Sequence, residues 1–440
     1  MTTRAAMLGG ARPADRALPV LAAFASLPVG AALGLALYRS PPPLAMAVAG
    51  GLGLVLVLAL ALARYHAAVA LGALLLGVQV VDPSPSDGVF FVVMAVAFAT
   101  RRFHLSAVPR PVLALLAVFG ALNVMASIQV VDPERAIVFF GTTAYLALFA
   151  IWLAGYLTSR RRARLLLRAY LAAAIASAVI GVLALLGVLP GHDLLTESDR
   201  SRAFFQDPNV FGPFLIPPVL ILIEEIVHPR LLSARLVTKA VLVAILLAGV
   251  LFSYSRGAWV NLALGLLVLG LILSLRGGVR TIAALFAVLV VTAGVMAGVV
   301  VATGSADFLA ERARPQTYDT EGFSGQRAGL RPAAEYPFGA GPGQFESVAH
   351  ISAHSTYARA LGEEGYPGLL TLLALLGFTL VAGLRNAVAG RSTRGIGSAA
   401  LLAAWCGLLA NSAVIDTLHW RHLWVFAALI WAASVRSARA

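Results

Sequence analysis

The sequence predicts an all-α polytopic membrane protein, and its composition, the length of its apolar runs and their pattern all indicate this class. The chain has 440 residues, of which 60% are hydrophobic and 12% are charged, and its mean hydropathy is +0.88. The charged fraction of soluble domains is about twice as large. Because lipid offers no hydrogen bonds to the backbone, only helices and closed barrels cross a membrane. The apolar runs are continuous rather than alternating, which favours helices.

Apolar runs that approach the ~20 residues needed to cross a bilayer recur along the whole chain. The expected spans are 18–38, 44–63, 67–81, 88–101, 109–130, 137–157, 166–189, 209–228, 237–254, 258–275, 281–303, 367–384, 397–415 and 422–435. The third and fourth are short and joined by a polar turn, so 67–101 is either a re-entrant pair or two spans. We therefore expect 12–14 transmembrane helices.

The spans divide the chain into three parts. Residues 1–303 hold up to 11 of them, residues 304–366 form a large, partly helical extracytoplasmic loop, and residues 367–440 supply the C-terminal transmembrane helices. A loop of that length is usually functional or disordered. Its alternation of helix-forming stretches with tight turns favours the first reading.

Within this loop the sequence predicts two short helices and a turn. One helix runs through 326–335, where Pro332 would bend or end it. The other has Ser355 as its N-cap and stops at Gly365. Between them, the glycines and prolines of 337–343 predict a backbone elbow.

The distribution of charge predicts the orientation, since cytoplasmic loops are enriched in Lys and Arg. With the spans above, one side carries 22 of the 33 Lys and Arg residues and three of the 20 Asp and Glu residues. We expect that side to be cytoplasmic and to hold both termini, in a multi-pass protein of the bacterial inner (cytoplasmic) membrane. The basic charge then indicates contact with membrane lipids, and no nucleic-acid partner is expected because no soluble basic domain exists.

Four polar clusters fall on the expected extracytoplasmic side. They are Arg202–Asn209, Ser253–Gly257, Gln326–Arg327, and His354–Tyr357 followed by Glu363–Gly365. Arginine stays protonated, and its planar guanidinium binds phosphate oxygens in a bidentate manner. Three arginines on one side therefore suit a diphosphate-bearing ligand. His354 precedes an expected helix start, whose positive end favours the neutral imidazole that can accept a proton.

These clusters resemble the O-antigen ligase and O-antigen polymerase superfamily of integral-membrane glycosyltransferases. The resemblance rests on Arg202 with Phe205–Asn209, on Ser253–Gly257, on Pro337–Phe345, and on His354–Tyr357 with Glu364 and Gly365. Order and spacing agree from about residue 200 to residue 385. The first two hundred residues are similar only as a series of spans.

The resemblance implies a lipid-dependent (GT-C-like) glycosyltransferase fold and metal-independent, inverting transfer without a cofactor. It also implies a polyprenyl-diphosphate-linked glycan as donor and a hydroxyl on a glycan or lipid core as acceptor. Catalytic roles fall to Arg202 and Arg256, which would hold the diphosphate, and to His354, which would activate the acceptor. Substrate-binding roles are expected for Arg327, Asn209, Ser255, Tyr357, Gly341, Gly343 and Glu364.

Other functions compete with this interpretation. A polymerase would use the same chemistry with the next lipid-linked repeat as acceptor, and a transporter or flippase would use the arginines as a release site. A transporter should show polar or charged residues near mid-membrane in both halves, and only scattered neutral groups such as Asn123 and Asn261 are expected there.

Each residue also has a simpler interpretation. Arg256 could snorkel to head groups, Arg202 could pair with Asp199 or Asp207, and His354 with His350 could bind zinc, although the glutamate of the protease pattern is missing.

The remaining polar groups near this side have simple interpretations as well. Glu363 and Glu364 are interpreted as solvated residues at a helix end. His419 and His422 are interpreted as part of an interfacial belt beside Trp420.

Overall fold

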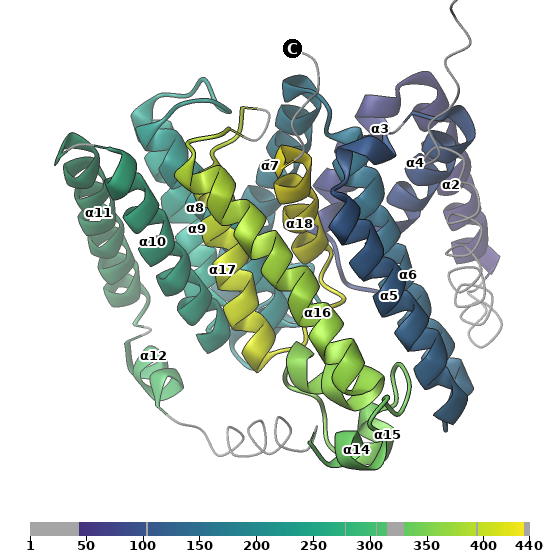
Figure 1. Ribbon diagram of the computed structural model, residues 1–440. Coiled ribbons are helices and arrows are strands. Elements are labelled where there is room, and N and C mark those ends of the chain that lie inside the picture. The colour runs from purple at the N-terminus through teal and green to yellow at the C-terminus, as the bar shows by residue number, and fades with distance from the viewer. Residues whose placement is uncertain are drawn as a thin grey trace, which may run out of the picture.

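Helices make up almost all of the computed structural model, which describes residues 44–102, 104–277, 279–304, 306–314, 330–392 and 395–434 (Figure 1). The α-helices are α2 (Leu44–Ala63), α3 (Tyr65–Leu74), α4 (Pro85–Thr100), α5 (Arg110–Ala126), α6 (Pro133–Tyr156), α7 (Arg160–Leu185), α8 (Pro208–Val227), α9 (Leu236–Phe252), α10 (Arg256–Arg276), α11 (Val279–Thr303), α12 (Ala306–Ala313), α14 (Leu330–Glu335), α15 (Phe345–Ala349), α16 (Thr356–Val388), α17 (Ser398–Val414) and α18 (Arg421–Ser434). Four short 3-10 helices and one hairpin complete the described chain: η1 (Leu75–Gly77), η2 (Leu105–Ala107), η3 (Ser127–Gln129), η4 (His192–Leu195), β1 (Thr196–Glu197) and β2 (Arg200–Ser201).

The predicted class, an all-α polytopic membrane protein, is confirmed. Every predicted span from 44–63 onward falls on a helix, and 18–38 lies outside the described residues. Among the described residues, six helices are long and apolar enough to cross a membrane: α5 with η3, α6, α7, α8, α10 and α16. The predicted total of 12–14 spans stays a prediction.

Helix α3 is too short to cross a membrane by itself. α3 has ten residues, so it is about 15 Å long, half of the ~30 Å hydrocarbon core. The chain then continues through η1 to Gln79, whose backbone N–H donates to the carbonyl of Phe204 at 2.7 Å. The α3–α4 connection therefore reaches the segment that precedes α8.

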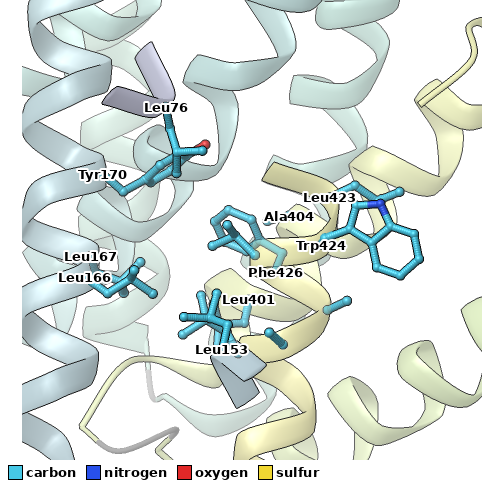
Figure 2. Close-up of a cluster of buried hydrophobic side chains, with 14 of the residues drawn as sticks. Leu76, Leu153, Leu166, Leu167, Tyr170, Leu401, Ala404, Leu423, Trp424 and Phe426 are labelled. Carbon is cyan, nitrogen blue, oxygen red and sulfur yellow. The ribbon is translucent and has the colours of Figure 1, made fainter. Parts of the chain in front are cut away.

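The hydrophobic core lies where α6, α7, α8, α17 and α18 meet. Figure 2 shows Leu153, Tyr170, Leu401 and Phe426 from four of these helices packed together, all at most 2% exposed. α8 is the most enclosed of the candidate spans, since 83% of its apolar window is buried, against 22% for the window in α5. α8 therefore runs through the interior of the bundle, and α5 lies at its edge.

The helix predicted to begin at Ser355 and to stop at Gly365 forms as expected. The Ser355 hydroxyl accepts hydrogen bonds from the backbone N–H groups of Tyr357 and Ala358, which confirms it as the N-cap. Gly365 interrupts the helix. It adopts φ 68° and ψ −167°, and the helical path resumes beyond it through Val388.

Helix α14 corrects the expectation for Pro332. The helix continues past this proline to Glu335, so Pro332 does not end it. The predicted start at 326 is outside the described residues.

The predicted elbow wraps around the kink in α16. The N–H groups of Ala340 and Gly341 donate to the carbonyls of Gly362 and Glu363 at 3.0 and 2.9 Å. The N–H of Tyr366 donates to the carbonyl of Pro337 at 3.1 Å. The backbones approach so closely because both segments carry glycine at the contact.

We predict that Gly365→Ala destabilises the protein by about 2–4 kcal/mol. The new Cβ would overlap the carbonyl oxygen of Pro337, and φ 68° is itself unfavourable for alanine. The check is the apparent melting temperature in detergent. The matched control is Gly377→Ala on the same helix, where nothing lies within 4 Å of an added Cβ. Equal melting temperatures for the two variants would contradict the role of the kink.

Candidate functional site

Three helices that carry predicted site residues begin close together. We call this the loop-side end of the bundle, the end at which α12, α14 and α15 lie in Figure 1. α8, α10 and α16 start with the N-caps Asp207, Ser255 and Ser355, each of which accepts a hydrogen bond from its own first turn. The positive ends of three helix dipoles therefore lie at this end.

Direct contacts connect these three helix starts. An added Cβ on Gly212 of α8 would meet Ser253 and Ala258, which flank the start of α10. An added Cβ on Gly257 of α10 would lie 3.7 Å from Asn411 and Val414 near the end of α17.

The start of α16 reaches the same part of α17. Ser355 donates to the carbonyl of Ser412 at 3.3 Å, and the Tyr357 hydroxyl donates to that of Leu409 at 3.0 Å. The last turns of α17 therefore lie between the start of α10 and the start of α16, and the structure brings these two predicted clusters together.

Arg202 does not form an ion pair with a carboxylate of its own cluster. Its guanidinium donates to the carbonyls of Gln206 and Leu194, both at 3.2 Å. No ion pair joins it to a described carboxylate, so the interpretation as a surface pair with Asp199 or Asp207 is wrong.

Arg200, which the sequence analysis did not single out, contacts both the first turn of α8 and the α9–α10 connection. Its Nη2 donates to Asn209 Oδ1 at 2.8 Å, and its Nε donates to the Ser253 carbonyl at 3.0 Å. It thereby links β2, the first turn of α8 and the α9–α10 connection. The available signal was a second arginine two residues before Arg202, beside the same polar cluster.

Arg256 is half-buried, and helix α12 packs beside it. Its Nη1 lies 3.4 Å from the carbonyl of Arg314, just beyond α12. The Phe308 ring of α12 packs edge-on against Tyr254 with ring centroids 4.5 Å apart. Ser255 is buried and serves as the cap of α10. Residues 306–314 thus cover the α9–α10 connection from the side.

His354 is exposed at the start of α16, and its imidazole makes no hydrogen bond to any residue in the described ranges. His350 is also exposed and has a left-handed backbone, with φ 57°. Neither His takes part in a group of three or more His, Cys, Asp or Glu side chains within the described part of the chain. Arg327, the remaining predicted cation, lies outside the described residues.

The elbow glycines Gly341 and Gly343 pack against protein. An added Cβ on Gly341 would overlap Val130, and one on Gly343 would lie 2.9 Å from the ring of Phe139. Between them and α15, the buried Gln344 accepts hydrogen bonds from the N–H groups of Val131 and Asp132. The elbow therefore joins the α5–α6 connection to α16.

The sequence suggested that Glu363 is solvated at a helix end. In the structure its side chain is buried, with only 2% exposed. Its carboxylate accepts hydrogen bonds from the N–H groups of Gly343 and Phe345 at 2.8 and 3.2 Å, and from Arg359 Nη1 at 2.7 Å. Glu364 is likewise buried, at 3%, and its Oε2 has no hydrogen-bond partner among the described residues. The elbow and the next helical turn close over both carboxylates.

Arg359 is the centre of a buried ion cluster that sequence reasoning also missed. Its guanidinium lies 2.6 Å from Glu346, 2.7 Å from Glu363 and 2.7 Å from Asp416. Glu346 in turn pairs with Arg135 of α6 at 2.6 Å. Four elements, α6, α15, α16 and the α17–α18 connection, are tied together here.

Asp416 also fixes the first turn of α16. Its Oδ1 accepts a hydrogen bond from the Thr356 hydroxyl at 3.2 Å, and the Thr356 Oγ1 accepts one from the N–H of Thr417 at 2.8 Å. Because Thr356 is two residues after His354, the ion cluster sets the backbone position from which the imidazole projects.

The histidines after α17 are more deeply buried than expected for residues of an interfacial belt. His422 is fully buried against Phe214 and Trp420, with ring centroids 5.7 and 5.0 Å apart. His419 is half-buried and lies 3.0 Å from the Thr143 hydroxyl. Burial lowers the pKa of His419.

Arg421 forms the second buried ion cluster of the described chain. It pairs with Asp87 at 2.6 Å and with Asp82, so it connects the α3–α4 connection to the start of α18. The protein interior therefore holds charged side chains besides the neutral groups expected near mid-membrane. Neither carboxylate gave a sequence signal, since both lie in a turn that reads as a polar connection.

The chain matches no protein-family model and no curated protein. The fold and the site therefore define the class, a multi-pass helical membrane protein with a cluster of helix starts and cations at one end.

We predict that Arg359→Gln lowers stability by about 3–5 kcal/mol, because it leaves three carboxylates around an uncompensated site. Thermal unfolding in detergent measures the loss. Arg385→Gln is the control, since that residue is exposed at the far end of the same helix. A loss for Arg359→Gln no larger than that of the control would contradict the role of the ion cluster.

Acid should weaken the same cluster. Burial raises the pKa of the Glu346 carboxyl, but Arg359 and Arg135 lower it by more, so the net pKa lies below 4.5. A depressed pKa contributes stability that is complete above the unfolded pKa and is lost as the pH falls through the folded pKa. We expect Glu346→Gln to melt below the parent at pH 7, and the difference to shrink progressively as the pH falls below about 4.3, the pKa of an unperturbed Glu. A difference that stays constant with pH would contradict this assignment.

Proposed function

We propose that the chain is a metal-independent, inverting glycosyltransferase that moves a glycan from a polyprenyl-diphosphate carrier to an acceptor hydroxyl. In the O-antigen ligase-like form, the acceptor is a lipid core or another surface molecule. The reaction would take place on the extracytoplasmic side of the bacterial inner membrane, with both termini in the cytoplasm.

One observation carries this proposal: α8, α10 and α16 start at the same end of the bundle, each beside a basic side chain. Arg200 and Arg202 precede α8, Arg256 begins α10, and His354 precedes α16. Helix N-termini and guanidinium groups both favour anions. A diphosphate at head-group level suits this combination.

The chemistry needs that positive charge most when the bond breaks. The diphosphate leaves as a multiply charged anion, so fixed cations stabilise the transition state more than the ground state. In this proposal Arg256 and the Arg200–Arg202 pair hold the departing diphosphate. The donor arrives already activated, so neither a nucleotide sugar nor a metal is required.

His354 is proposed to take the proton from the acceptor hydroxyl. The side chain is exposed and makes no hydrogen bond within the described ranges, so it is free to meet a substrate. The positive end of α16 favours its neutral form. Arg359 and Asp416 are positioning residues, because they hold the turn that carries His354 and do not reach the substrate themselves.

Two other functions remain as alternatives. A polymerase would use the same site with a lipid-linked repeat as acceptor. The buried pair of Arg421 with Asp87 favours a transporter or flippase of lipid-linked glycans more than the sequence did, because interior charges mark many transport pathways. Transfer activity distinguishes an enzyme from a transporter.

The test is reconstitution of the full chain in liposomes with a lipid-linked glycan and two acceptors, a lipid core and a second lipid-linked glycan. We expect His354→Ala to lower turnover by about 10²–10⁴-fold, the usual contribution of a general base. Arg256→Ala should lower turnover and also weaken donor binding. The acceptor that is consumed separates ligase from polymerase.

His350→Asn is the matched control, since it removes an exposed imidazole four residues away and asparagine tolerates a positive φ. It should transfer at the parental rate. Full activity in both His354→Ala and Arg256→Ala would refute the mechanism. Movement of the donor across the bilayer without transfer would favour the flippase.

A further inference from the structure

A basic cavity lies at the opposite end of the bundle from the candidate site. It has a volume of about 540 Å³ and is lined by His66, Arg160, Arg161, Arg162, Arg164, Leu165 and Arg168. A second cavity of about 320 Å³ shares His66 and Arg162 with it, and adds Tyr65, Arg102, His104 and Tyr156. The two cavities therefore adjoin through His66 and Arg162.

The cavity lies beside the C-terminal end of α16, whereas the candidate site lies at its N-terminal end. An added Cβ on Gly395, which follows the end of α16, would meet the side chain of Arg160. His354 precedes the start of the same 33-residue helix. Residues 366–388, beyond the kink at Gly365, alone span about 35 Å, so the basic cavity and the candidate site are separate.

The five arginines of this cavity have no acidic partner among the described residues. Arg164 and Arg168 donate instead to the backbone carbonyls of Arg230 and Leu231, at 2.6 and 2.7 Å. Five like charges around one space repel each other, and an anion in that space would relieve this repulsion.

Hydrogen bonds and ring contacts hold part of the lining in place before any ligand binds. Arg162 donates to the Tyr156 carbonyl at 3.1 Å and lies over the ring of Tyr156 at 5.2 Å. His66 Nδ1 lies 2.8 Å from the Tyr156 hydroxyl, and Arg102 lies over the Tyr65 ring at 5.5 Å. Preorganised guanidinium groups lose less entropy on binding phosphate than mobile ones.

We propose that this basic cavity binds the phosphodiester headgroup of an anionic phospholipid. Phosphate oxygens would accept hydrogen bonds from the arginines, and the acyl chains would extend along the apolar surface beside the cavity. Leu58 and Leu62 of α2 are 43% and 58% exposed, and Leu62 is four residues before His66. An exposed apolar helix next to a basic cavity suits a lipid better than a soluble phosphate.

The experiment titrates the purified full-length protein in neutral detergent with dioctanoyl phosphatidylglycerol, and follows binding by native mass spectrometry. Dioctanoyl phosphatidylcholine, with the same chains and a zwitterionic headgroup, and inorganic phosphate are the comparison ligands. We expect phosphatidylglycerol to bind most tightly. Arg160→Gln with Arg161→Gln should weaken it about 30-fold, since each cation near the headgroup contributes about fivefold.

Arg110→Gln with Arg391→Gln is the control, because it removes two exposed arginines that line neither cavity. The control should bind like the parent. Arg160→Lys with Arg161→Lys keeps the charge and should bind within about fivefold of it. If the glutamine pair does not fold, Arg161→Gln alone removes one cation of the same cavity and should weaken binding about fivefold.

Three results would overturn the proposal. The first is parental binding by the folded glutamine variants. The second is an equal loss in the control, which would indicate a diffuse surface charge. The third is inorganic phosphate binding as tightly as phosphatidylglycerol, which would assign the cavity to a soluble anion.

Discussion

The ion cluster around Arg359 is the interaction on which the loop-side end of the bundle depends. One guanidinium holds carboxylates from α15, from the next turn of α16 and from the α17–α18 connection. Glu363, one of these carboxylates, also accepts two backbone N–H groups of the elbow, so the cluster, the elbow and the kink at Gly365 form one unit. A guanidinium with three carboxylates is stable in a buried place only when its hydrogen bonds are satisfied. The geometry that pairs Arg359 with these carboxylates also fixes the turn before α16, and therefore the position of His354.

This arrangement explains why the sequence predicted the helices better than the site. Apolar runs and the N-cap at Ser355 are local signals, and each described run became a helix in its expected place. The partners of Arg359 are up to 57 residues away in the chain, and no local pattern pairs Arg359 with Asp416. Pro332 was misjudged because proline commonly ends a helix, whereas α14 continues past it to Glu335. The interruption at Gly365 was predicted from the glycine itself, but no local pattern indicates the hydrogen bonds of the elbow around it.

The predicted site residues fall into two groups. Ser255 and Tyr357 contact their own helix starts or α17, and Asn209 is bound by Arg200, so their chemistry is partly used within the protein. His354 is exposed and makes no such contact among the described residues. The proposed enzyme would therefore consist of a rigid frame of capped helix starts with an accessible imidazole at its edge. The basic cavity at the other end of α16 belongs to a separate surface, and its proposed lipid would contact the opposite leaflet.

The most direct measurement is an experimental structure of the protein in a nanodisc with a bound polyprenyl diphosphate. The account predicts that the two phosphates lie at the joined starts of α8 and α10, within hydrogen-bond distance of Arg256 and of Arg200 or Arg202, with His354 facing the diphosphate-linked carbon. Phosphates bound among Arg160, Arg161 and Arg162, or at neither end of the bundle, would contradict it.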